Sequence, residues 1–88
     1  MVKFTYALKR FFPGLQDTAA KGSTLLEVLG EMDACYPGVL GYILDEQHHL
    51  RKHVNIFIDG TVITDRQQLS DPFGKDSEIY VMQALSGG

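Results

Sequence analysis

The sequence predicts an α+β domain in which one main helix packs against a small mixed β-sheet. Three observations support this prediction: an alternating apolar pattern near the start, one helical apolar stripe in the middle, and two further strand patterns towards the end. At 88 residues the chain has room for a single hydrophobic core. Its 44% hydrophobic content is typical of a folded domain. We therefore expect a sheet of four to five strands with the helix across one face.

The first segment is expected to be a β-hairpin. Apolar and polar residues alternate over residues 2–9, which places Val2, Phe4, Tyr6 and Leu8 on one side of a half-buried strand. A Pro-Gly turn signal follows at residues 13–14. A second strand over residues 16–21 is only weakly indicated, because Ala19 and Ala20 are poor strand formers.

The middle of the sequence changes to helical spacing. Thr24 followed by Glu27 matches a capping box at a helix start, and Pro37-Gly38 marks the helix end. Between these signals runs one apolar stripe of Leu25, Val28, Leu29, Met32 and Cys35 or Tyr36. Residues 39–44 are expected to add a helical turn before a polar loop.

The C-terminal half reads as a hairpin followed by one more strand. Residues 54–58 alternate, Asp59-Gly60 is a strong two-residue turn signal, and residues 61–64 return as a strand. In the final strand, over residues 78–83, Ile79 and Val81 point one way while Tyr80 and Met82 point the other. This order of elements fits a β-grasp arrangement, with the first and last strands adjacent and parallel at the sheet centre.

Charge and hydropathy exclude several classes of partner. The formal net charge is −3, and the longest basic runs are the pairs Lys9-Arg10 and Arg51-Lys52, so no nucleic-acid partner is expected. No apolar stretch approaches the length of a membrane span, so no membrane partner is expected either. The single Cys35 cannot form an internal disulfide, which is typical of a reducing compartment, and we expect a cytoplasmic location.

The reactive side chains do not form a recognisable catalytic or metal site. His48, His49 and His53 lack a spaced carboxylate or cysteine to complete a metal site, so we expect a solvated loop and no bound metal. Cys35 has an acidic neighbour and lies at the wrong helix end for activation, so we expect it to pack in the core. Without a glycine-rich phosphate loop or paired acids, an enzyme acting alone is not expected.

The last residues point to chemistry at the C-terminus. We divide the chain into a domain of residues 1–83 and a flexible tail of residues 84–88 that ends in Gly87-Gly88, with about 15 Å of reach. Two residues without Cβ atoms can enter a narrow channel. The α-carboxylate of Gly88 is a poor acylating group and needs activation by another protein, most simply as a mixed anhydride with a nucleotide phosphate. A frayed end without a role is the alternative at this point.

Taken together, the chain resembles the MoaD/ThiS family of small sulfur carrier proteins, which are ubiquitin-like β-grasp domains. The resemblance rests on "TLLEVLGEMDACYPGVLGYIL", "VNIFIDGTVI", "GKDSEIYVMQ" and the terminal "GG". The extended polar loop before "VNIFIDG" is more similar to MoaD and the cysteine-biosynthesis carriers than to the thiamine-pathway members. Many relatives carry proline where this chain has Gln83.

The resemblance implies a function for Gly88. An E1-like adenylyltransferase would use ATP to adenylate Gly88, with Gly87 as its unhindered neighbour and no cofactor bound by the carrier itself. A sulfurtransferase or cysteine desulfurase would then supply sulfur for a thiocarboxylate. That group would be passed to an enzyme of molybdopterin, thiamine or cysteine biosynthesis, or used within a molybdopterin synthase-type complex in which this chain is the small subunit. The alternative is a ubiquitin-like modifier that is joined through Gly88 to lysines of target proteins.

A carrier also needs a surface on which its partners dock. Phe57, Tyr80 and Met82 share the strand parity opposite to the expected core, so we predict that they form an apolar docking patch. The tail residues Ala84, Leu85 and Ser86 are predicted to contact the same partners.

Overall fold

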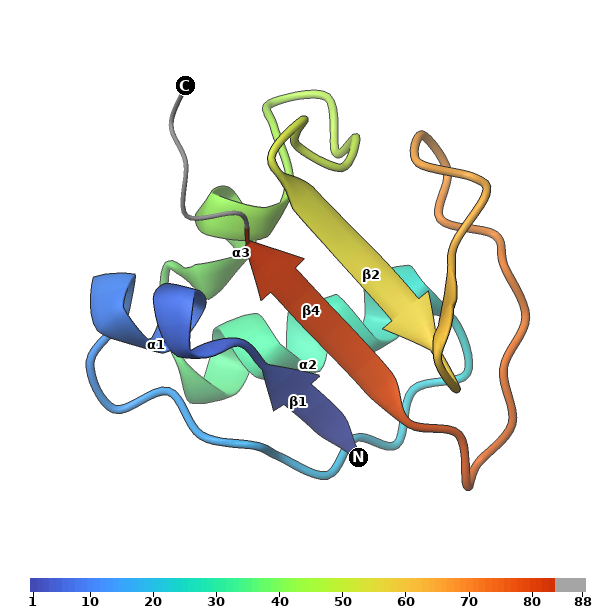
Figure 1. Cartoon of the computed structure of the whole chain (residues 1–88), viewed down its shortest axis with the longest axis horizontal. Coiled ribbons are helices and arrows are strands. Elements are labelled where there is room, and N and C mark those ends of the chain that lie inside the picture. Colours follow the sequence, from blue (N-terminus) through green and yellow to red (C-terminus); the bar gives the residue numbers. More distant parts are fainter. Residues whose placement is uncertain (84–88) are drawn as a thin grey trace.

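The centre of the fold is a mixed sheet of four strands. A computed structural model describes residues 1–83 of the protein; the predicted tail of residues 84–88 lies outside the described residues. The strands are β1 (Val2–Phe4), β2 (Val54–Ile58), β3 (Thr61–Val62) and β4 (Ile79–Gln83), and they lie in the order β1-β4-β2-β3 (Figure 1). β4 pairs parallel with β1 and antiparallel with β2, so the predicted adjacency of the first and last strands is confirmed.

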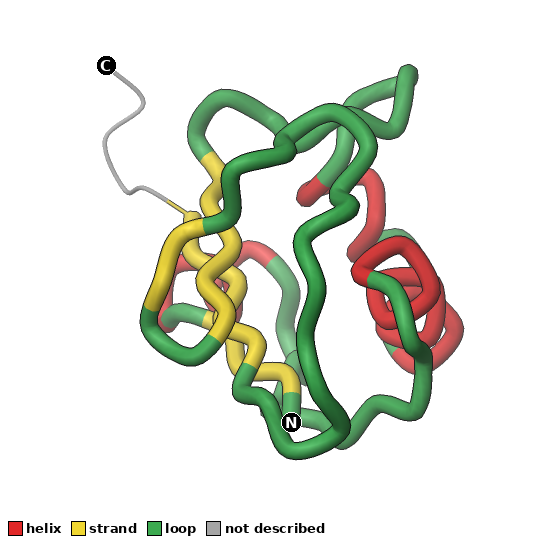
Figure 2. Tube along the Cα trace, turned by 90° about the vertical axis from the view of Figure 1, so that its right-hand side faces the viewer, coloured by secondary structure: helices red, strands yellow, loops and turns green. Residues whose placement is uncertain are grey.

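Three helices accompany the sheet: α1 (Tyr6–Phe11), α2 (Leu25–Cys35) and α3 (Val39–Ile43). Figure 2 shows the strands and the coil of α2 as two separate layers. The predicted helix start of α2 is confirmed, because Oγ1 of Thr24 accepts a hydrogen bond from the Glu27 N–H at 3.1 Å. The carboxylate of Glu27 accepts a hydrogen bond from the Ser23 N–H at 3.0 Å, whereas a capping box would use the Thr24 N–H. The side chains of Thr24 and Glu27 thus each accept a backbone hydrogen bond at the helix start.

The hydrophobic core lies between α2 and the inner face of the sheet. Every core residue among those described is apolar, and none of the buried residues is polar or charged. Burial of each large aliphatic side chain contributes about 1.5–3 kcal/mol. From α2 come Leu25, Val28, Leu29 and Met32; from the sheet come Val2, Phe4, Val54, Ile56, Ile79 and Val81.

The predicted N-terminal hairpin is wrong. β1 ends at Phe4, and the following residues form α1 instead of continuing the strand, which leaves Tyr6 76% exposed and buries Leu8. The expected second strand is reduced to one bridge, in which Val2 and Thr18 exchange backbone hydrogen bonds of 2.8 and 2.9 Å. Within the described residues β1 is therefore an edge strand of the named sheet, and β4 alone of this pair is central.

Two loops are held by aspartate side chains that accept backbone hydrogen bonds. Oδ1 of Asp33 accepts from the N–H groups of Gly38 and Leu40, both at 3.1 Å, and so fixes the turn between α2 and α3. In the loop after β3, the Asp65 carboxylate accepts from several N–H groups of residues 67–70, and Asp71 accepts from the Asp65 N–H at 2.8 Å. These bonds order the connection that leads into β4.

Candidate functional site

An apolar hollow lies on the outer face of the sheet, opposite α2. Phe57 of β2 and Tyr80 of β4 lie directly opposite each other in the strand register, and Met82 follows on the same face. The hollow has a volume of about 480 Å³ and is lined by Phe57, Asp59, Gly60, Glu78, Tyr80 and Met82. The structure therefore brings the three predicted patch residues together; their role in docking stays a prediction.

One end of this hollow carries charged side chains. Lys3 of β1 pairs with Tyr80 in the strand register. Its Nζ lies 2.9 Å from the Glu78 carboxylate. The hydrogen bond to Glu78 raises the pKa of Lys3 above its usual value. The backbone N–H of Glu78 donates to Oδ1 of Asp59 at 2.9 Å, and this bond lowers the pKa of the Asp59 carboxyl. The hollow therefore has a charged and hydrogen-bonded rim beside its aromatic floor.

The other end of the hollow leads to the root of the tail. β4 ends at Gln83, which pairs with Val54 and whose N–H donates to Oγ1 of Thr5 at 3.3 Å. Residues 84–88 follow directly, so the predicted sites Gly87, Gly88, Ala84, Leu85 and Ser86 lie outside the described residues. β4 lies between β1 and β2 (Figure 1); it carries the patch residues Tyr80 and Met82 on one face and ends at Gln83.

Sequence reasoning missed two exposed apolar residues near the site. Tyr6 is 76% exposed and directly follows Thr5, the residue whose hydroxyl accepts from the Gln83 N–H. In α1 the buried residues are the neighbours Ala7 and Leu8, which a strand would place on opposite faces, so the alternation of residues 2–9 gave no signal that Tyr6 is exposed. Val62 lies opposite Phe57 and is 44% exposed, which extends the apolar face onto β3.

The prediction that Cys35 packs in the core is wrong, because this thiol is exposed. Tyr36 takes its place: its ring packs against the core, and its hydroxyl lies 2.9 Å from Oγ1 of Thr18. Among the described residues no group of three or more His, Cys, Asp or Glu side chains is placed to hold a metal ion. The described part of the chain also has no helix long and apolar enough to cross a membrane.

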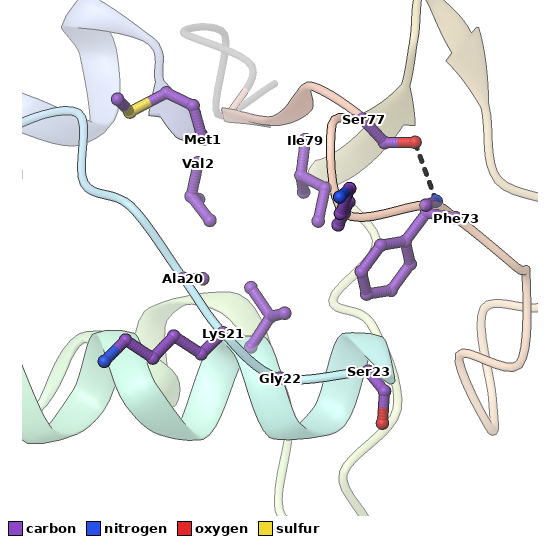
Figure 3. A pocket seen from close by; sticks show the side chains of 12 residues that line it. Met1, Val2, Ala20, Lys21, Gly22, Ser23, Phe73, Ser77 and Ile79 are labelled. Atoms are coloured by element: carbon purple, nitrogen blue, oxygen red, sulfur yellow. Dashed lines mark hydrogen bonds between the residues drawn. The ribbon is translucent and has the colours of Figure 1, made fainter.

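A second hollow, of about 410 Å³, lies beside the start of β1, at the end of the sheet farther from Gln83. Figure 3 shows its apolar wall, formed in part by Phe73 and Ile79, and the bond at 2.9 Å from the Gly74 N–H to Oγ of Ser77. The nearby N–H of Lys21 already donates to the Glu31 carboxylate at 2.8 Å. Among the described residues no hydrogen bond joins Ser23 or Ser77 of this hollow to a lysine side chain, so we assign it no chemistry.

Comparison with known proteins agrees with this geometry. The sequence profile of the ThiS family matches residues 3–88. The chain belongs to the ThiS family. Members of this family are small carrier proteins rather than catalytic enzymes. None of the curated protein sequences matches the chain.

Solved structures show the same β-grasp fold as this ThiS-family chain. CysO in the Amycolatopsis orientalis BexX/CysO complex is 19% identical with a TM-score of 0.81, covering 99% of this chain and 97% of its own. Small archaeal modifier protein 1 from Methanosarcina acetivorans is 24% identical with a TM-score of 0.78, over 99% and 93%. CysO from Mycobacterium tuberculosis is 21% identical with a TM-score of 0.79, over 96% and 97%.

Proposed function

We propose that this ThiS-family protein is a sulfur carrier that works through the carboxyl group of Gly88. The observation that carries the proposal is the geometry of β4. This central strand lines the outer-face hollow with Tyr80 and Met82 and ends at Gln83, five residues (84–88) before the C-terminus. A partner that docks on the hollow is thereby placed beside the root of the tail.

The chemistry starts from a carboxylate that is unreactive by itself. Its oxygen attacks the α-phosphate of ATP on an E1-like enzyme, and pyrophosphate leaves. A persulfide sulfur from a sulfurtransferase or cysteine desulfurase then attacks the acyl carbon and displaces AMP. A donor thiol cleaves the resulting sulfur–sulfur bond, so the thiocarboxylate is released and the donor is oxidised to a disulfide. Gly87 places no side chain beside the reacting carbon.

The carrier itself supplies recognition rather than catalysis. Phe57, Tyr80 and Met82 are the proposed docking patch, since aromatic and methionine side chains are enriched at protein interfaces. The activating enzyme binds the ATP, and the carrier binds no cofactor. The final acceptor belongs to molybdopterin, thiamine or cysteine biosynthesis, and all of these steps take place in the cytoplasm.

The second candidate is a protein modifier that forms an amide between Gly88 and a target lysine. The similarity to a structure named small archaeal modifier protein 1 supports this second candidate. The same acyl adenylate serves both outcomes, and only the attacking nucleophile differs.

Intact mass spectrometry tests the proposal. The protein is incubated with its cognate E1-like enzyme, ATP and a sulfur donor, beside a control that lacks Gly88. We expect the mass shift of one oxygen-to-sulfur exchange in the full chain and no shift in the control. Lysine adducts in place of this exchange favour the modifier, and neither product with a genuine partner overturns both candidates.

A further inference from the structure

Gln83 carries a polar atom that the fold leaves without a partner. It is the last residue of β4 and shares strand parity with the buried Ile79 and Val81, so its side chain lies on the inner side of the sheet. Oε1 of Gln83 is buried and accepts no hydrogen bond from the described residues. Within the described chain, no other buried side-chain nitrogen or oxygen lacks a partner.

An unpaired buried carbonyl oxygen is unfavourable, because it gives up its hydrogen bonds to water and gains none in return. The great majority of buried side-chain polar atoms in folded proteins do have a partner, so such an atom indicates that a donor is missing. The backbone N–H of Gln83 already donates to Oγ1 of Thr5, whereas Oε1 of its side chain has no hydrogen-bond partner among the described residues.

Oε1 of Gln83 lies at the start of the segment that a partner would bind if it acts on residues 84–88. Gln83 directly precedes residues 84–88, and it follows the patch residue Met82. Gln83 is only partly buried, and the terminal torsion of a glutamine side chain is soft. Nε2 of the same amide is not among the buried unpaired atoms, so a half-turn about this torsion exchanges Oε1 with Nε2 and gives an incoming donor access to Oε1 without moving β4.

We infer that Gln83 is a positioning residue for activation of the tail. Its Oε1 accepts a hydrogen bond from an N–H donor of the E1-like enzyme, and this bond forms only in the complex. It fixes the root of the tail, and thus the start of the path by which the Gly88 carboxylate reaches the nucleotide. This inference rests on the proposed function, because it concerns the same activation step.

The test substitutes Gln83→Met, which keeps the length of the side chain and removes the amide. The matched control is Gln68→Met, the same chemical change at an exposed position in the loop after β3. For each variant we measure the thermal midpoint of the isolated protein, and the KM for carrier and the kcat in ATP–pyrophosphate exchange with the cognate enzyme.

For Gln83→Met we expect an unchanged or higher thermal midpoint, because the unpaired oxygen is gone. We expect the KM for carrier to rise roughly tenfold, the size of one lost hydrogen bond, with kcat little changed. Gln68→Met should match the wild type in both measurements. A lower midpoint for Gln83→Met shows that the amide is already satisfied in the free protein, and an unchanged KM shows that the enzyme does not use it; either result overturns the inference. No exchange with the wild-type protein overturns the proposed function as well.

Discussion

The backbone N–H of Gln83 donates to the side-chain oxygen of Thr5 at 3.3 Å, and this bond joins the end of β4 to the residue that follows β1. Thr5 also stands at the N-cap position of α1, yet its side chain makes no capping bond there. Its hydroxyl instead accepts the hydrogen bond from Gln83 of β4. The root of the tail is therefore fastened to the N-terminal segment by a side chain, beyond the last paired residues of the β1–β4 ladder.

Removal of this hydroxyl is expected to destabilise the protein. Thr5→Val keeps the shape of the side chain but leaves the Gln83 N–H without its acceptor, which should lower the free energy of unfolding by about 1 kcal/mol. Urea denaturation followed by circular dichroism measures this loss. Thr5→Ser retains the hydroxyl and is the control; equal stability of the two variants would contradict the prediction.

Tyr80→Gln is expected to weaken activation without unfolding the domain. Tyr80 is 37% exposed on the outer face, so its replacement should lower the free energy of unfolding by only about 1 kcal/mol, through the lost contact with Phe57, and leave the domain folded. Loss of a central aromatic contact at an interface costs on the order of 2 kcal/mol, or about thirtyfold in the KM for carrier. Pyrophosphate exchange with the cognate E1-like enzyme measures that constant.

Leu26→Gln serves as the control for Tyr80→Gln, because Leu26 lies on α2 and is 43% exposed. Its removal takes away a similar exposed apolar group from an element that packs on the inner face of the sheet. A rise in KM that is equal for the two variants would show that the outer face has no special role.

Two glycine substitutions are expected to have opposite effects on stability. A Cβ on Gly22 would lie 2.7 Å from Cβ of Glu27 and 3.0 Å from the backbone nitrogen of Val28. Gly22→Ala should therefore cost about 1–3 kcal/mol through overpacking. A Cβ on Gly30, inside α2, would meet nothing within 4 Å, and Gly30→Ala should stabilise the helix by up to about 1 kcal/mol. Thermal unfolding of both variants checks the opposite signs, and two destabilised variants would contradict them.

The Asp65 carboxyl is expected to make the free energy of unfolding depend on pH in the acidic range. Hydrogen bonds, first of all from the Ser70 hydroxyl and then from backbone N–H groups, lower its pKa to about 2 in the folded protein. Because the folded pKa lies below the ordinary value of 3.8, the contribution is complete above about pH 5 and is lost as the pH falls through about 2. Chemical denaturation at several pH values should show a flatter dependence in this window for Asp65→Asn than for the wild type. Identical slopes would contradict this assignment.

Much of the fold could be predicted because its signals are local. The Thr24 cap, the Asp59-Gly60 turn and the alternation in β4 each lie within a few residues of the structure they specify. The prediction for the N-terminal segment was wrong because its alternation runs on past Phe4, where the strand ends, and buries Leu8 in either a strand or a helix; only packing decides between the two. The same ambiguity placed Cys35 in the core in place of Tyr36.

The candidate site was predictable in part for the same reason. Strand parity alone groups Phe57, Tyr80 and Met82 on one face, but the direct pairing of Phe57 with Tyr80 depends on the β2–β4 register. The bond between Thr5 and Gln83 spans 78 positions, and no pattern in a single sequence indicates a contact at that distance. The unpaired oxygen of Gln83 is likewise a property of three-dimensional packing.

The parallel pairing of β1 with β4 has a mechanical consequence. The start of β1 and the end of β4 lie at opposite ends of the ladder, so a pull on the C-terminus against an anchored N-terminus is directed along both strands (Figure 1). Such a force loads all the cross-strand bonds together in shear instead of opening them one after another. The β1–β4 pair is therefore expected to resist a force applied along β4 better than a force that separates the two strands sideways.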